Sequence, residues 1–361
     1  MIKAVLRIVI ALIFIASGFV KAVDPIGFSF KLEEYFSAGV FNMPFLEPFA
    51  LPISIFVVAL ELILGVALLF NIKTKKVLAV LIALCVFFAF LTFYSAYFNK
   101  VTDCGCFGDA IKFTPWQSFI KDIILLVGLL ILWVLYKKES TVQKSNGIQK
   151  ITLLASIFFT GFILVYGIIR EPMIDFRSYK IGTNMKLEQQ KIAQDPSVYK
   201  VFYTAKNEKT GEEKSLDQDE YVNNKIYWEE GSPWKLLDDK TESKLVKEGY
   251  KSEISKFKLD GQDGSDWTQK VIAAPKAIVI FSYHPNLADK AVIQKAQEKA
   301  KKSGNTLVLG VAPNFGVYQA IPAATMDGTA IKTIARSNPS ILILENGTIV
   351  DKVPGHVFVE N

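Results

Sequence analysis

The chain has few of the residues that most often bind metals or form disulfides. Of its 361 residues two are histidines, His284 and His356, and three are cysteines, Cys85, Cys104 and Cys106. A two-cysteine metal site needs further ligands, and both histidines lie far along the chain from the cysteines. We therefore expect no metal centre, and any disulfide chemistry must lie within the first 106 residues.

Acidic residues are scarce in the first half of the chain. Residues 1–170 hold 15 Lys and Arg against 9 Asp and Glu, whereas residues 171–361 hold 26 against 26, so the first half carries the whole net charge of +6. Residues of the types AVILMFWYC make up 51% of the chain, and a soluble domain reaches about 45 to 50% only when Gly is included. A nucleic-acid-binding protein would gather its basic residues on a soluble face. Here they lie between apolar runs, which excludes nucleic acid as a partner.

Five apolar runs each approach the roughly 20 residues that a membrane-spanning helix needs. They are Ala4–Val20, Pro52–Phe70, Val77–Phe98, Phe119–Tyr136 and Ile151–Ile169. The first run could be a signal peptide, but Gly18–Lys21 is a poor cleavage site and four further runs follow. We expect five transmembrane helices in a lipid bilayer.

Basic residues gather at alternate ends of these runs. The basic ends contain Lys3, Arg7, Lys73, Lys75, Lys76, Lys137, Lys138, Lys144 and Lys150, with only Glu139 opposing them. Because cytoplasmic loops carry the excess of Lys and Arg, this pattern predicts an inner-membrane protein with a cytoplasmic N-terminus. The third loop and everything after Ile169 are then periplasmic.

Cys104 and Cys106 lie in this third loop, on the oxidising side. With one residue between them, a bond is near the outer limit of disulfide geometry, and Gly105 relieves the backbone. Strained, exposed disulfides are the labile or catalytic ones, which favours an exchange-active pair. A static bridge, or a metal or intermolecular bridge that needs a partner, stays open. Asp103 and Asp109 would raise the pKa of nearby thiols. Cys85, inside an apolar run, is interpreted as a small core residue.

The third loop resembles a known family. Its core, followed by Thr114 and Phe119–Asp122, looks like the MauE (methylamine utilisation) branch of the DoxX-like membrane proteins. That core is Cys104-Gly105-Cys106-Phe107-Gly108. The stretch Ser17–Phe28, with Tyr35 after it, is similar to the DoxX-like signature at the end of the first helix. The resemblance covers about residues 1–140 and implies a four-helix bundle and a role in forming or maintaining disulfides of exported proteins.

Polar residues in the apolar half are further candidates. Lys21 can extend its ammonium to the interface and Asp24-Pro25 forces a turn, so Lys21 and Asp24 are expected to form an interfacial anchor pair rather than a ligand site. Glu61, halfway along the second run, should face the interior of the bundle. It has either a functional role, in proton handling or beside a quinone, or a buried hydrogen bond between helices.

The second half reads as an exported α/β region. Val201–Thr204 and Lys225–Trp228 are expected to be short strands. A buried strand at Ala277–Ser282, a helix from about Leu287 to Lys301 and a strand at Thr306–Val311 form a βαβ unit with parallel strands. A hairpin from Ile341 to Val350, turning at Asn346-Gly347, completes the region.

This order, with Asn338-Pro339 before the hairpin, resembles the thioredoxin-like fold over about residues 250–361. The resemblance implies a cis bond at Pro339. Where that family has its two-cysteine motif, this chain has Tyr283-His284-Pro285-Asn286, so the domain cannot exchange a disulfide by itself. His284 and His356 are expected to be inert.

The sequence therefore predicts a membrane all-α bundle followed by a soluble α/β thioredoxin-like domain. Its four parts are residues 1–140 (four transmembrane helices), 141–172 (the fifth helix and connector), 173–250 (mixed α+β) and 251–361 (thioredoxin-like). The expected function is thiol/disulfide exchange with exported proteins through Cys104 and Cys106, with a quinone as one candidate electron carrier. The alternative is a non-catalytic assembly or binding module. Supporting site residues are Gly105, Asp103, Phe107, Gly108, Lys21, Asp24 and Glu61.

Overall fold

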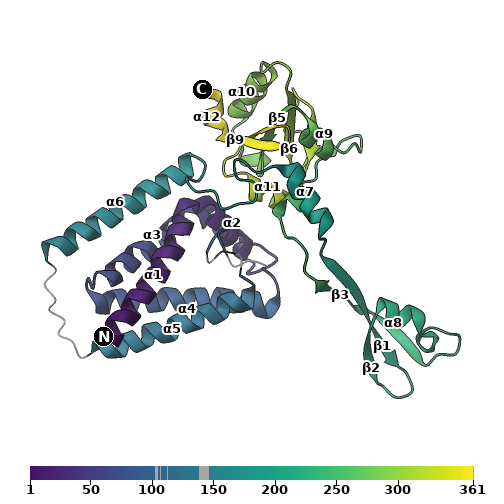
Figure 1. The fold of residues 1–361 in the computed structure, drawn as a ribbon, viewed down its shortest axis with the longest axis horizontal. Coiled ribbons are helices and arrows are strands. Elements are labelled where there is room, and N and C mark those ends of the chain that lie inside the picture. Colours follow the sequence, from purple (N-terminus) through teal and green to yellow (C-terminus); the bar gives the residue numbers. More distant parts are fainter. Residues whose placement is uncertain (102–104, 106, 112, 138–145, 361) are drawn as a thin grey trace. The chain divides into compact units, whose positions relative to one another are not determined.

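The structure, a computed structural model, describes every residue except 102–104, 106, 112, 138–145 and 361 (Figure 1). It divides into two compact units. One comprises Met1–Gly182 with Lys258–Asn361, and the other comprises Thr183–Phe257. The finer division into four parts stays a prediction.

Among the described residues of the first unit, five helices are long and apolar enough to cross a membrane, which agrees with the predicted number. They are α1 (Ile2–Val23), α3 (Ala50–Leu69, preceded by the 3-10 helix η1, Pro44–Phe49), α4 (Thr74–Phe98), α5 (Pro115–Lys137) and α6 (Gly147–Ile169). A shorter helix, α2 (Pro25–Phe36), follows α1 directly. The third loop, residues 99–114, joins α4 to α5. We call these six helices the bundle.

Asp24 explains why α1 stops and α2 starts at one point. Pro25 has no backbone N–H and so begins a new helix at its first position. The Asp24 side chain accepts a hydrogen bond from the backbone N–H of Gly27 at 2.9 Å and thereby caps α2. The chain therefore turns at the end of the first span, as expected from Asp24-Pro25.

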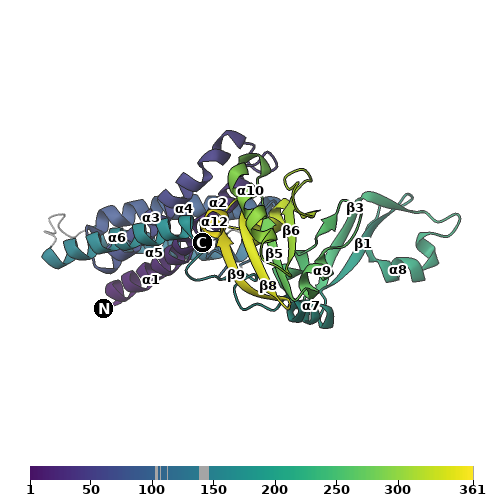
Figure 2. The ribbon, with the colours of Figure 1, turned by 90° about the horizontal axis from the view of Figure 1, so that it is seen from above.

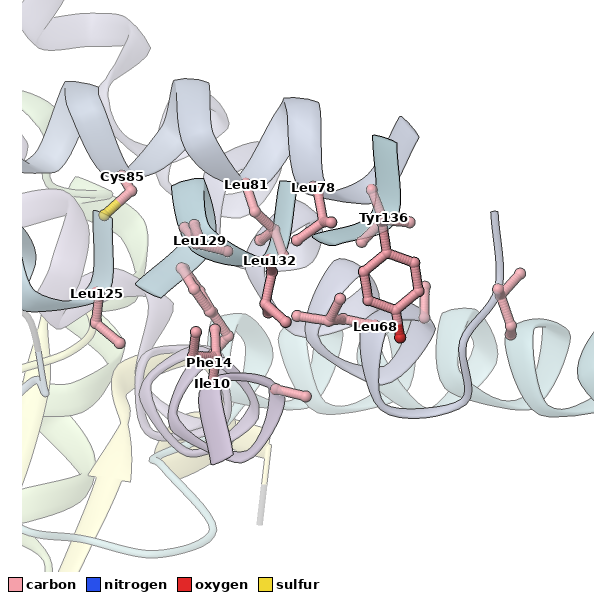
Figure 3. Close-up of a cluster of buried hydrophobic side chains, with 14 residues drawn as sticks. Ile10, Phe14, Leu68, Leu78, Leu81, Cys85, Leu125, Leu129, Leu132 and Tyr136 are labelled. Carbon is pink, nitrogen blue, oxygen red and sulfur yellow. The ribbon is translucent and has the colours of Figure 1, made fainter. Parts of the chain in front are cut away.

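Leucine and aromatic side chains fill the bundle core between α1, α4 and α5. Ile10 and Phe14 of α1 pack against Leu81 of α4 and Leu129 of α5 (Figure 3). A second cluster, around Val58, joins α3 to α1, α2 and α6. These clusters hold the bundle as one body around the polar residues described below.

The C-terminal domain, residues 258–361, contains a six-stranded mixed sheet in the order β4-β7-β6-β5-β8-β9. Figure 2 shows β6, β5, β8 and β9 of this sheet. The central strands β5, β6 and β7 are parallel, whereas β8, β9 and β4 are antiparallel to their neighbours. The strands are β4 (Asp260–Gly261), β5 (Lys276–Phe281), β6 (Leu307–Ala312), β7 (Ala323–Thr325), β8 (Ser340–Glu345) and β9 (Thr348–Pro354). The helices are α9 (Thr268–Ala273), η4 (Pro285–Leu287), α10 (Lys290–Lys301), α11 (Gly328–Ile334) and α12 (Gly355–Glu360).

This sheet confirms the parallel βαβ unit and the final hairpin. Each residue of β5 is buried except the first, as a strand covered on both faces requires. The Asn338–Pro339 bond is cis, as expected. An apolar helical region followed by a mixed α/β domain is therefore the architecture of this chain.

The segment that follows α6, residues 170–182, which we call the connector, is held to this domain by ion pairs and a hydrogen bond. Arg177, which is 5% exposed, bonds Asp175 at 2.7 Å and Glu171 at 2.8 Å and donates to the carbonyl of Ile334 at 2.8 Å. Lys352 of β9 bonds Asp175 at 2.6 Å. Because buried charges must be paired, these contacts fix where the chain leaves the membrane relative to the sheet.

The second unit is a small antiparallel sheet in the order β2-β1-β3 with short helices. Its elements are α7 (Met185–Gln194), β1 (Val198–Asn207), β2 (Glu213–Asp217), α8 (Gln218–Asn223), η2 (Lys225–Tyr227), β3 (Trp234–Lys247) and η3 (Glu253–Lys256). The expected strand at Val201–Thr204 lies within β1, but the one at Lys225–Trp228 is wrong. Asn224 caps a 3-10 turn there by accepting from the N–H of Ile226 at 3.4 Å.

Candidate functional site

A buried ammonium–carboxylate pair joins α1 to α3. Lys21 Nζ lies 3.0 Å from Glu61 Oε2 and donates to Glu61 Oε1 at 3.2 Å, and both residues are 2% exposed. Nζ also donates to Ser17 Oγ at 2.6 Å, one helical turn earlier. Charges this deep in an apolar bundle are expensive and usually functional.

This pair corrects one prediction and confirms another. We expected Lys21 to reach the membrane interface beside Asp24, but its ammonium is turned into the bundle because Glu61 supplies a buried counter-charge. Asp24 bonds a different cation, described below. Glu61 faces the interior of the bundle, as its position halfway along the second run predicted.

A cavity inside the bundle borders this pair. Its walls include Lys21, Glu61, Cys85, Lys121 and Asp122 from α1, α3, α4 and α5. It leaves about 20 Å³ for the centre of a water molecule, which is room for one or two waters.

Asp122 is the second buried carboxylate of this cavity. It lies 2.7 Å from Lys121 and accepts from the Thr92 hydroxyl at 3.1 Å. Cys85 Sγ donates to the Asp122 carbonyl at 3.3 Å and is 2% exposed. Figure 3 shows Cys85 on α4 at the edge of the leucine cluster. Its position fits the expected role as a small core residue.

A second cavity opens on the side of the third loop. It is lined by Lys21 and Asp24 from the α1 end, by Gly105, Gly108 and Asp109 of the loop and by the connector residues Ile174, Phe176 and Arg177. Lys21 therefore borders both cavities.

Arg336 of the C-terminal domain binds this region. Its Nε lies 2.8 Å from both carboxylate oxygens of Asp24, and its Nη2 lies 3.1 Å from Asp109 of the third loop. Burial favours a higher pKa for Asp24, but Arg336 and Arg177 hold it below the usual value. The C-terminal domain is thus bound to the third loop through one guanidinium.

A second contact joins α2 to α11 of the C-terminal domain. Glu33 of α2 bonds Lys332 of α11 at 2.7 Å and lies 3.8 Å from His284 Nε2. Burial opposes the charge of Glu33, but hydrogen bonds from His284 and Lys332 lower its pKa. Tyr283 packs edge-on against Phe30 at 5.0 Å between ring centres. His284 therefore has a structural contact that the sequence did not predict.

The expected site residues are only partly within the described chain. Cys104, Cys106 and Asp103 lie outside it. Gly105 and Gly108 have φ of +65° and +51°, which L side chains rarely adopt, so both glycines are required by the backbone. The Phe107 ring lies 5.3 Å from Lys121 Nζ. Among the described residues, no group of three or more His, Cys, Asp or Glu is placed to hold a metal ion.

Sequence reasoning missed Arg336, Lys332, Glu33 and Asp122. Asp122 appeared only within the MauE-like motif, although an acid in an apolar run was a usable signal, as it was for Glu61. The partners of Arg336 lie more than 200 positions away, and no local pattern reports such a contact.

The apolar helices, their buried polar pair and the appended sheet define a multispanning membrane protein with a C-terminal α/β domain. Residues 1–136 match the family model described as methylamine utilisation protein MauE. The chain is also 30% identical over 167 residues to Protein TlpB of Flavobacterium psychrophilum, a match covering 44% of this chain and 43% of the relative. The chain therefore spans less than half the length of that relative. No solved structure matches.

Proposed function

We propose that this chain is a membrane-embedded thiol/disulfide exchange protein that acts on exported proteins through Cys104 and Cys106. The observation that carries the proposal is the bond of Arg336 to both Asp24 and Asp109. It holds the cysteine-free C-terminal domain against the loop that contains the cysteine pair. The MauE match over residues 1–136, whose family resemblance implied disulfide chemistry, supports the same function.

The exchange needs no external oxidant. A thiolate from one member of the Cys104–Cys106 dithiol attacks a disulfide of the exported protein, so that a mixed disulfide forms and one substrate thiolate leaves. The second loop cysteine then displaces the other substrate sulfur. The loop ends oxidised and the substrate reduced, with two electrons moved, and the reverse sequence oxidises a substrate dithiol. A second protein resets the pair, with a dithiol when the loop has been oxidised and with a disulfide when it has been reduced.

The C-terminal domain supplies recognition in this proposal. It has no cysteine of its own, and it resembles a thioredoxin-like fold in its strand order and in cis Pro339. We propose that it holds the substrate segment over the third loop on the periplasmic side. The orientation follows from the basic ends of the apolar runs.

A quinone does not fit the cavity inside the bundle. The roughly 20 Å³ left there holds water but not a quinone ring.

Alkylation trapping in cells tests the proposal. Cys104 and Cys106 should shift between thiol and disulfide when cells are treated with reductant and oxidant. Cys104→Ser and Cys106→Ser should each leave exported disulfides wrongly formed, while Cys85→Ala should not, because that buried thiol lies inside the bundle.

A pair that stays oxidised in all conditions, with exported disulfides intact in both serine variants, would overturn the exchange function. The chain would then be an assembly or binding module whose cysteine pair is a fixed bridge. The same experiment therefore decides between the two classes.

A further inference from the structure

The Lys21–Glu61 pair contains a buried oxygen that needs a partner. Glu61 Oε2 is fully enclosed and accepts no hydrogen bond from the described residues. It lies 3.0 Å from Lys21 Nζ, close enough for charge attraction but without hydrogen-bond alignment. Buried carboxylate oxygens almost always have a hydrogen-bond donor. Something small is therefore expected to bind there.

The adjoining cavity identifies the missing donor as water. It touches Lys21 and Glu61 and leaves about 20 Å³ for the centre of a water molecule. A bound water needs two or more polar partners, and Lys21, Glu61, Lys121 and Asp122 line the same space. Water in this place would connect the carboxylate of Glu61 with the ammonium of Lys21.

Lys21 also borders the cavity on the side of the third loop, where Gly105 and Gly108 form part of the wall. Lys21 is therefore the residue at which the two cavities adjoin. Hydrogen-bonded chains of ammonium, water and carboxylate carry protons in membrane proteins, where ionisable groups in a bundle mark such paths. An ion pair with a purely structural role would not need to border a second cavity on the side of the third loop.

We propose that Lys21 and Glu61, with a water beside them in the inner cavity, form a proton-transfer site that accepts the thiol proton released at the third loop. The proposal rests on the function proposed above. Lys21 gives one N–H proton through this water to Glu61 Oε2 and becomes a neutral amine. The S–H bond of a loop thiol then breaks and its proton passes through the outer cavity to the Lys21 amine, so that a thiolate, an ammonium and a neutral carboxyl result. The leaving thiolate of the substrate takes the proton back.

Other titratable groups face Glu61 across the inner cavity. They are Lys21 from α1, Cys85 from α4 and Lys121 and Asp122 from α5. Asp122 has its own donors, Lys121 and Thr92. Glu61 is therefore the acceptor with an oxygen still open to a proton.

The test uses the full chain in lipid vesicles and oxidised glutathione as the disulfide. The rate at which the loop dithiol is oxidised is measured by alkylation quenching from mildly acidic to mildly alkaline buffer. Glu61→Gln should slow exchange about 100-fold at neutral pH, the low end for losing a general base. The loss should shrink in alkaline buffer, because solvent then removes the thiol proton.

A second variant separates proton transfer from folding. Glu61→Gln alone leaves Lys21 as a buried cation without its counter-charge, which can unfold the bundle. Lys21→Met with Glu61→Gln removes both charges together and should fold, yet it should remain as slow as Glu61→Gln. Ser54→Ala is the matched control. Ser54 lies on α3, the helix that contains Glu61, and its buried hydroxyl donates to the Pro25 carbonyl at 2.8 Å, but it does not line the cavity.

Time-resolved difference infrared spectra, recorded while the loop dithiol is being oxidised, give a readout besides rate. A band of a protonated carboxyl should appear in wild type and in Asp122→Asn and be lost in Glu61→Gln. If the neutral double variant exchanges at the wild-type rate with the wild-type pH profile, the proton-transfer site is wrong while the exchange function stands. If Cys104→Ser and Cys106→Ser do not alter the wild-type reaction, the exchange function itself fails.

Discussion

At the scale of single residues, Arg336 has the most connected side chain of the described structure. It is 4% exposed, bonds Asp24 with its Nε and Asp109 with its Nη2, and lies over the Phe30 ring at 5.5 Å. Arg336→Gln leaves Asp24 without its main counter-charge. We expect the free energy of unfolding of the C-terminal domain to fall by about 3 kcal/mol, as measured by pulse proteolysis over a urea series.

An exposed ion pair provides the control for Arg336→Gln. Lys276 lies 3.4 Å from Glu345, and their side chains are 44% and 50% exposed. Surface pairs contribute at most about 1 kcal/mol, so Lys276→Gln should leave the proteolysis curve almost unchanged. Equal shifts for the two variants would contradict the role given to Arg336.

The type of residue predicted whether a side chain is buried better than it predicted which residue that side chain contacts. Glu61 was expected inside the bundle because a carboxylate is too costly to face lipid, and it lies there. The partner of Lys21 was mistaken, because a flexible lysine near a helix end is compatible with either the interface or the interior. Only the position of Glu61 on a neighbouring helix decides between them. The contact between Asp24 and Arg336 could not be predicted from the sequence either, because the two residues lie 312 positions apart.

At the scale of elements, glycines set the contact between α1 and α3. A Cβ on Gly18 would lie 2.9 Å from the backbone N of Leu62, and one on Gly65 would lie 3.0 Å from Ile15. Small residues let membrane helices approach this closely. The approach also brings Lys21 within reach of Glu61.

Gly18→Val should push α1 away from α3. We expect a loss of about 1 to 3 kcal/mol from overpacking, seen as a lower melting temperature in detergent, together with weaker Lys21–Glu61 coupling. Gly161→Val on α6 is the matched control, since nothing lies within 4 Å of a Cβ there. A stable Gly18→Val protein would show that the helices need not be so close.

The contact of α2 with α11 should depend on acid. The folded pKa values of Asp24 and Glu33 are lowered from 3.8 and 4.5. Lowered carboxyl pKa values contribute stability that is complete above about pH 4.5 and is lost as pH falls through the folded values. Protease sensitivity of the C-terminal domain should rise below pH 4.5 in wild type. In Asp24→Asn with Glu33→Gln it should be high already at neutral pH, and an equally steep acid response there would contradict the assignment.

Element type followed from the sequence where the pattern was long. Five runs of apolar residues could only be membrane helices by length, and the continuous apolar β5 could only be a strand covered on both faces. The strand predicted at Lys225–Trp228 is wrong because its alternation of apolar and polar residues is too short to outweigh the capping side chain of Asn224.

At the scale of the whole molecule, one charge pattern predicts on which side of the membrane each functional group lies. The apolar runs carry Lys and Arg at alternate ends, which predicts that the third loop and the residues after α6 lie on the other side. The exchange function requires that other side to be oxidising. The proposed roles of the cysteine pair, the C-terminal domain and the proton path all require this orientation.

Cysteine labelling in intact cells tests that orientation. In a background of Cys85→Ala, Cys104→Ser and Cys106→Ser, a new cysteine is introduced at exposed Lys302 in the C-terminal domain or at exposed Lys76 at the start of α4. A membrane-impermeant maleimide should label Lys302→Cys in intact cells and Lys76→Cys only after permeabilisation. The reverse pattern would place the third loop in the reducing cytoplasm, where a strained two-cysteine bond would not persist, and the exchange function would lose its oxidising compartment.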